Sequence, residues 1–181
     1  MKKIKQFIKE MTPVITGVLL ALVINNWNEN RKDKRYLEQV YAAAKEELMA
    51  SSEHLAEVIP QQTALLDSID FYSVDDQITI YDILLKVNGV RVPTVRNNAW
   101  KAIAQSKIEL IEYEKIAMLS NVAEGKEIMS FKAEKLFDFI YQNLNTVSQD
   151  KKKIFKILVQ DLNYSTMSMQ SSIEELMKTE D

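Results

Sequence analysis

The chain has no cysteine and only three glycines and three prolines among its 181 residues. The absence of cysteine excludes disulfide bonds, thiolate metal ligands and a cysteine nucleophile. Glycine and proline mark turns, so their scarcity argues against a fold of many short strands and favours a few long helices. Because Gly17, Gly89 and Gly125 lie far apart, no glycine-rich loop is available to bind phosphate.

Histidine is equally scarce, since His54 is the only one. Its glutamate neighbours lack the Glu-x-x-His spacing of helical metal sites, so we interpret His54 as part of a solvated helix face. Asp70, Asp75 and Asp76 lie close together, but they lack the alternation and the glycine of a calcium loop, and helix capping explains them. The sequence therefore predicts no catalytic residue, no metal site and no cofactor, and a protein that is not an enzyme.

Charge is distributed unevenly along the chain. Residues 1–35 carry eight Lys or Arg against three acidic side chains, whereas residues 36–181 carry 15 basic and 23 acidic ones. A basic end on an acidic body is not the footprint of nucleic-acid binding, which needs positive charge on the folded domain. It is typical of basic flanks on either side of a membrane segment.

One long stretch lacks charge altogether, from Met11 to Asn28. As an α-helix these 18 residues rise roughly 27 Å, close to the roughly 30 Å of a bilayer's hydrocarbon core. A soluble core helix needs no basic cluster at both ends, and a cleaved signal peptide needs a small-x-small site that is missing here. We therefore predict a basic flank over 1–10, a single transmembrane helix over 11–28 and an acidic helical domain over 29–181.

The end of this stretch predicts a membrane interface at Asn25, Asn26 and Trp27, because amide and indole groups are favoured at headgroup level. Gly17, Ala21 and Asn25 share one stripe of the helix, and small residues at that spacing let two helices approach closely. They are the candidate helix–helix contact, with Asn25 able to hydrogen-bond across it. The alternative is that glycine and alanine occur there by chance.

The segment Gly17–Glu29, GVLLALVINNWNE, resembles the signature of an uncharacterised family of bacterial single-span membrane proteins, G-x-L-x-A-L-x-I-N-N-W-N-E. A charged helical stretch such as Arg31–Leu48 follows it in that family. A looser likeness lies at Asn97–Ser106, NNAWKAIAQS, where Lys107 takes the place of an expected glycine. The resemblance implies a membrane anchor with a helical body, in the bacterial inner membrane, and it supplies no catalytic residues.

Orientation rests on the two basic flanks. Four lysines and the amino terminus precede the predicted span, and Arg31, Lys32, Lys34 and Arg35 follow it. The positive-inside rule counts them almost equally and slightly favours a cytoplasmic amino terminus with the body in the periplasm.

Beyond the span, apolar residues recur at steps of four and three, which predicts that the helix continues into the body and ends at Pro60. The positions are Leu37, Tyr41, Ala44, Leu48, Ser51, Leu55 and Val58. Further helices are predicted over 61–72, 99–106, 113–123, 126–145 and 150–178, with a turn at Glu124-Gly125. Residues 77–95 fit either a helix capped by Asp75 or Asp76, or a strand, before an extended connector around Pro93.

The last two predicted helices have apolar stripes that must pack together. The stripes are Phe131, Leu136, Phe139, Ile140 and Leu144 in one, and Phe155, Leu158, Leu162, Ser165, Met169, Ile173 and Leu176 in the other. We predict an all-α bundle of about four main helices, with Trp100 as a core aromatic and Lys151–Lys153 as a solvated helix start.

Two functions remain open. The first is a membrane-anchored scaffold or interaction protein, whose partners are the lipid bilayer and either a second copy or another membrane protein, and not nucleic acid. The alternative is a sensory bundle that binds a small molecule between its helices and acts through a separate partner.

Overall fold

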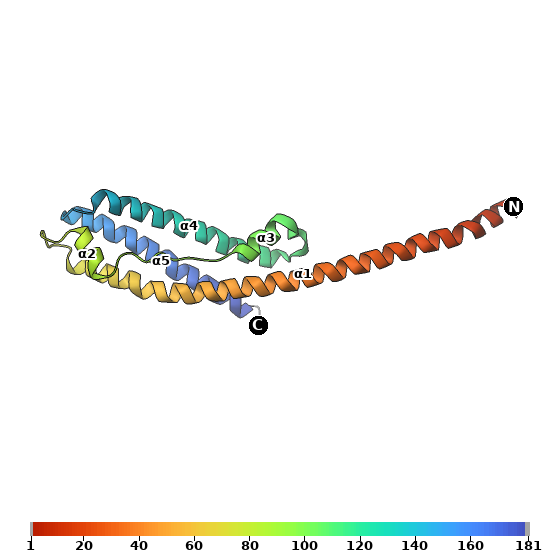
Figure 1. Ribbon diagram of the computed structural model, residues 1–181, viewed down its shortest axis with the longest axis horizontal. Helices are drawn as coiled ribbons and strands as arrows, with labels where there is room; N and C mark the ends of the chain where they lie inside the picture. The colour runs from red at the N-terminus through yellow and green to blue at the C-terminus, as the bar shows by residue number, and fades with distance from the viewer. Residues whose placement is uncertain (1, 180–181) are drawn as a thin grey trace. The chain divides into compact units, whose positions relative to one another are not determined.

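The computed structural model describes residues 2–179, and every regular element within that range is helical. Five α-helices and one 3-10 turn follow one another along the chain (Figure 1): α1 Lys2–Phe71, α2 Ile80–Lys86, α3 Asn98–Ser106, η1 Ile108–Leu110, α4 Tyr113–Asn143 and α5 Gln149–Thr179. The all-α prediction is confirmed. Helix α1 has 70 residues, so the prediction that one helix includes the apolar segment and continues into the body is confirmed as well.

The chain forms two compact units, Met1–Ala42 and Ala43–Asp181. The first unit contains only the first part of α1. The second contains the rest of α1 and all the other elements, and in it α4 and α5 lie side by side as an antiparallel pair (Figure 1). The extended connector around Pro93 runs from α2 at one end of this bundle to α3 at the other.

The core of the second unit is built from the predicted stripes. Ala44, Leu48, Leu55 and Val58 of α1 are buried. Leu65 and Ile69, two and three turns further on, join Leu136, Ile140, Phe155 and Leu162 in a single cluster with α2 residues Ile80 and Ile83. At roughly 1.5–3 kcal/mol for each fully buried side chain of this kind, these contacts supply the main stabilisation of the bundle.

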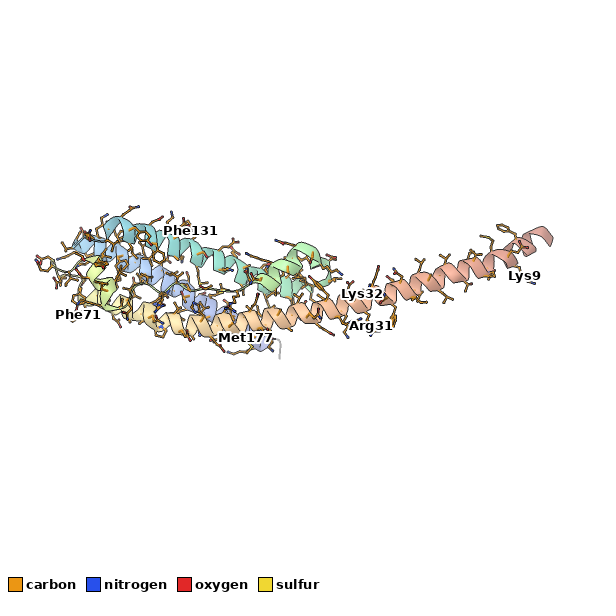
Figure 2. All side chains as sticks on the ribbon, in the orientation of Figure 1. Lys9, Arg31, Lys32, Phe71, Phe131 and Met177 are labelled. Carbon is orange, nitrogen blue, oxygen red and sulfur yellow. The ribbon has the colours of Figure 1, made fainter. Side chains whose placement is uncertain are left out.

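Phe131 is the exception to the predicted α4 stripe, because 58% of its surface is exposed. At 100° per residue it lies opposite Met129 and Leu136, which are buried and occupy the inward positions. Figure 2 shows Phe131 on the outer side of α4, and the Lys135 ammonium lies 5.3 Å from the centre of its ring. The prediction that Phe131 faces inward is wrong.

Pro60 does not end α1, which continues to Phe71, so the predicted break between two helices at Pro60 is wrong. Proline removes the hydrogen bond to the carbonyl of Ala56, one turn earlier. Both Pro60 and Ala56 are exposed, so water can satisfy that carbonyl. Leu55 and Leu65 are buried on either side of the proline, and packing holds both halves of the helix in line.

Gly125 does not end a helix either, because α4 runs unbroken from Tyr113 to Asn143. A Cβ at Gly125 would overlap the Cε of Met169 in α5. The glycine therefore leaves space for the end of the Met169 side chain against α4. Sequence alone cannot distinguish this packing role from a C-terminal cap, since both use the missing side chain.

Helix α2 resolves the ambiguity over residues 77–95, which form a helix followed by extended backbone. Thr79, and neither Asp75 nor Asp76, is its N-cap: the Thr79 hydroxyl accepts from the Asp82 N–H at 3.1 Å, and the Asp82 carboxylate accepts from the Thr79 N–H at 2.9 Å. The predicted aspartate caps are wrong. Instead, Asp75 accepts a hydrogen bond from the backbone N–H of Gln77 at 2.8 Å and so stabilises the preceding turn.

Acid should weaken this cap. Hydrogen bonds from the Thr79 hydroxyl and the Thr79 backbone N–H hold the pKa of the Asp82 carboxyl below its ordinary value. A lowered folded-state pKa stabilises the fold above the unfolded-state pKa, near 3.9 for aspartate, and the stabilisation is lost as the pH falls through the folded-state value. Urea unfolding between pH 6 and pH 3 should therefore show a smaller acid-induced loss of stability for Asp82→Asn than for the wild type.

Asp138→Asn, which changes an exposed carboxylate of α4, is the matched control. An identical pH dependence for Asp82→Asn and the wild type would contradict a stabilising role for the ionised cap.

Candidate functional site

The apolar segment of α1 is the most unusual surface of the described chain. From Lys9 onward, α1 contains an 18-residue window with a mean hydropathy of 1.2, and none of that window is buried. Within residues 2–179 this is the one helix long and apolar enough to cross a membrane. A core helix of a soluble protein can pass the same test of length and composition, but it is mostly buried, and this window is not.

The distribution of the apolar side chains around the helix distinguishes the two environments further. Val18, Leu19 and Leu20 are 55–58% exposed, and successive residues point 100° apart. Leu22, Val23 and Ile24 repeat this coverage one turn later, with exposures of 59–65%. A surface helix of a soluble protein is apolar on one side only, whereas this segment is apolar around its whole circumference.

The predicted interface residues lie at the end of this segment, and all three are exposed. The ring of Trp27 is 63% exposed, and the Arg31 guanidinium carbon lies 5.8 Å from the ring centre, within range of a cation–π contact. The sequence prediction named Trp27 but missed its pairing with Arg31, although the i,i+4 spacing is a usable signal.

The predicted helix–helix stripe is also on the surface. Gly17, Ala21 and Asn25 are exposed, and a Cβ built at Gly17 would meet nothing within 4 Å. Within the described residues, the glycine is therefore not needed for packing inside the chain. In a contact between two helices, the absence of a side chain at Gly17 would allow the two backbones to approach closely.

In the second unit, polar side chains of α1 hold the extended connector in place. Ser51 accepts a hydrogen bond from the Arg96 N–H at 2.9 Å, and the Gln62 side chain donates to the Arg91 carbonyl at 3.1 Å. Glu47 accepts from the Ala99 N–H at 3.1 Å, so its carboxylate lies at the positive end of α3. These contacts join residues far apart in sequence, and no local pattern predicts them.

Trp100, in the first turn of α3, is a core aromatic as predicted, because only 8% of its surface is exposed. It lines a small internal space together with Leu48 and Leu119, so it joins α3 to both α1 and α4. The ring serves the packing of the bundle.

His54 is not part of a solvated face, and that interpretation is wrong. The residue is half-buried, and its Nε2 atom is fully buried without a hydrogen-bond partner. Asn163 and Gln62 each have one side-chain oxygen in the same condition. Among the described residues, no group of three or more His, Asp or Glu side chains is placed to hold a metal ion.

Lys152 is fully buried, although Lys151 and Lys153 beside it are exposed, so the prediction of a solvated lysine cluster is wrong for the central residue. Its ammonium group donates to the carbonyls of Tyr72 at 2.9 Å and Asp75 at 2.5 Å. These carbonyls follow the end of α1, where the helix dipole favours a positive charge. Lys152 therefore fastens the start of α5 to the end of α1.

Removing this ammonium should destabilise the bundle. Lys152→Met keeps an unbranched side chain but leaves two carbonyls without their charged donor, which should lower the free energy of unfolding by about 2–3 kcal/mol. Lys153→Met, which breaks only an exposed ion pair with Asp150, should change it by less than about 0.5 kcal/mol. Chemical unfolding of the full-length protein in detergent measures both. Equal effects would show that the buried contacts contribute no more than a surface pair.

Several grooves open on the second unit, and two of them differ clearly in polarity. The more apolar one, about 340 Å³ in volume, lies between α2 and the last turns of α4. Tyr81 and Leu85 form one wall and Phe137 and Tyr141 the other, with the last two rings stacked 6.1 Å apart. A more polar groove of about 310 Å³ lies between α4 and α5, and Lys132, which lines it, forms an ion pair with Asp161. Both volumes fall at the lower end of the range for small-molecule sites.

No family model matches the chain, and neither the curated proteins nor the solved structures contain a match.

Proposed function

We propose that this protein is a single-span membrane protein whose helical bundle binds other proteins and catalyses no reaction. The observation that supports it best is the apolar window of α1, which is apolar on all sides and 0% buried. Such a surface is stable in lipid, where no aqueous solvent contacts it. The likeness of its sequence to the bacterial single-span family agrees with this placement.

Alkaline carbonate extraction tests the span. A transmembrane protein stays in the membrane pellet at high pH, whereas a peripheral protein is released. Recovery of the full-length chain in the supernatant would refute the proposal, and so would removal of its first thirty residues.

We place the protein in the bacterial inner membrane, with the amino terminus in the cytoplasm and the bundle in the periplasm. The resemblance supports the membrane, and the almost balanced basic flanks support the orientation only narrowly. Reporter fusions at the two ends of the chain test it, using one reporter active in the cytoplasm and one active in the periplasm. Cytoplasmic activity of a fusion after Asp181 would reverse the orientation.

The partner in this proposal is a second copy of the chain or another membrane protein, bound through the stripe of Gly17, Ala21 and Asn25. The open space around Gly17 and the exposure of all three residues support it. In a bilayer, small residues allow close backbone approach, and an amide side chain gains a hydrogen bond across the interface.

Cross-linking in native membranes tests the stripe. Gly17→Ile combined with Asn25→Leu should remove the cross-linked species, because it fills the close approach and deletes the amide. Leu19→Ile combined with Val23→Leu, on the opposite side of the helix, should leave that species unchanged. Oligomers that survive the first pair of changes would show that this stripe is not the contact.

A second function, the binding of a small apolar molecule, is favoured by the groove between α2 and α4. Its aromatic walls and its volume of about 340 Å³ suit a small apolar metabolite. A thermal-shift screen of the full-length protein in nanodiscs should then show stabilisation that rises with ligand concentration, by about 2.7 kcal/mol at a hundred times the dissociation constant. Leu85→Lys, in the wall of the groove, should abolish the shift if the ligand binds there.

A further inference from the structure

Four cations follow the apolar segment of α1 within five residues: Arg31, Lys32, Lys34 and Arg35. All four are exposed, and Figure 2 shows Arg31 and Lys32 projecting from the helix. Within the described chain, no carboxylate forms an ion pair with any of them. Their charge is therefore available to a ligand outside the chain.

The cations and the neighbouring carboxylates lie on opposite sides of the helix. At 100° per residue, the four cations and Trp27 fall within an arc of about 160°. Glu29 and Asp33 lie on the opposite side, four residues apart. Although Asp33 stands in the middle of the sequence RKDKR, it does not divide the basic surface. The result is one continuous cationic face above an indole ring.

Trp27 sets the depth of this face relative to a bilayer. An exposed indole is favoured at headgroup level, and Arg31 lies against its ring at 5.8 Å. At 1.5 Å per residue, Arg31 is about 6 Å and Arg35 about 12 Å beyond Trp27 along the helix. Long Lys and Arg side chains span such distances, so all four cations can reach the level of the phosphates.

We propose that this face, Arg31 to Arg35 together with Trp27, binds the headgroups of anionic phospholipids. A phosphodiester accepts two parallel hydrogen bonds from a guanidinium group, and a lysine ammonium adds a point charge. The inference rests on the proposed membrane span, which brings the face to the lipid.

The continuity of the face with the apolar segment favours lipid over an acidic protein surface. Its cations begin four residues after Trp27, so a helix held in a bilayer places them among headgroups.

Quenching of tryptophan fluorescence by brominated lipids tests the proposal directly. The full-length protein is reconstituted in bilayers of three parts phosphatidylcholine to one part phosphatidylglycerol, with bromine on either one lipid or the other. Trp27→Phe gives the background from buried Trp100. We expect brominated phosphatidylglycerol to be enriched around Trp27 by about fivefold over its share of the bilayer at low salt. One molar salt, with a Debye length of about 3 Å, should remove most of the enrichment.

The variant with Arg31, Lys32, Lys34 and Arg35 all changed to Gln should lose the enrichment while Trp27 is still quenched by both lipids. The control changes four exposed lysines of the bundle to Gln, Lys101, Lys135, Lys151 and Lys153, and should retain it. Equal quenching by both lipids in the wild type would overturn this inference and leave the membrane span intact. Absence of quenching by either lipid would overturn the span itself. Enrichment that survives in the quadruple variant, with loss of cross-linked oligomers instead, would assign the cations to an acidic protein surface.

Discussion

Replacing Leu20 with arginine should remove the protein from the membrane. Leu20 lies at the middle of the 11–28 segment and is 58% exposed, so in the proposed arrangement its side chain faces lipid. Arginine at the centre of a transmembrane helix costs about 2.5–3.5 kcal/mol, which corresponds to a roughly 70- to 400-fold shift in partitioning. The uncharged segment is barely long enough to span a bilayer, so its favourable free energy of insertion is small and offsets little of that cost. Recovery of the protein in carbonate-washed membranes measures the shift.

Met11→Arg is the matched control, because it introduces the same charge at the end of the segment. There the long side chain can reach the headgroup level, and the cost should be close to zero. If both variants remain in the membrane pellet like the wild type, the segment does not cross the bilayer. If both are lost equally, the effect of arginine reflects a general loss of folded protein and not its depth in lipid.

The sequence predicted the class of the fold and most of its core, because helix periodicity is a local signal. Leu48 and Leu55 in α1, and Leu162 in α5, belong to apolar stripes at helical spacing, and each is buried as expected. Phe131 fits the same spacing less well, and it is exposed because Met129 and Leu136 already fill the inward side of α4. An apolar residue near a stripe is therefore not sufficient to assign its direction.

Helix ends were harder to predict, since proline and glycine are ambiguous. Pro60 and Gly125 both signal a break, yet each lies inside a continuous helix. Whether the helix continues depends on packing across the bundle: buried residues flank Pro60, and Met169 approaches Gly125 from α5. Neither contact can be inferred from neighbouring residues.

The candidate site likewise has features that the sequence predicts and contacts that it does not. The apolar segment and Trp27 follow from composition, because a span is defined by a run of residue types. The contacts of Lys152 with the end of α1 and of Glu47 with the start of α3 join residues more than fifty positions apart. Burial of Lys152 in particular runs against the usual exposure of lysine, so only the three-dimensional arrangement reveals it.

Replacing Phe155 with alanine should cause the largest loss of stability in the bundle. Its side chain is fully buried, it belongs to the central cluster, and its ring stacks on Phe139 with the ring centres 6.5 Å apart. Removing a buried phenylalanine ring in this way costs about 3–5 kcal/mol, through lost burial and the cavity that remains. For a unit of this size, that corresponds to a fall in Tm of roughly 6–20 °C.

Phe131 provides the matched control on the neighbouring helix, because it is the same residue type with 58% of its surface exposed. Phe131→Ala should change the free energy of unfolding by less than about 0.5 kcal/mol. Urea unfolding of the full-length protein in detergent, followed by the fluorescence of buried Trp100, reports on both. Since the two substitutions delete the same atoms, any difference between them measures burial and not residue type. A similar loss in both variants would contradict the inward direction of Phe155 and with it the packing of α5 against α1 and α4.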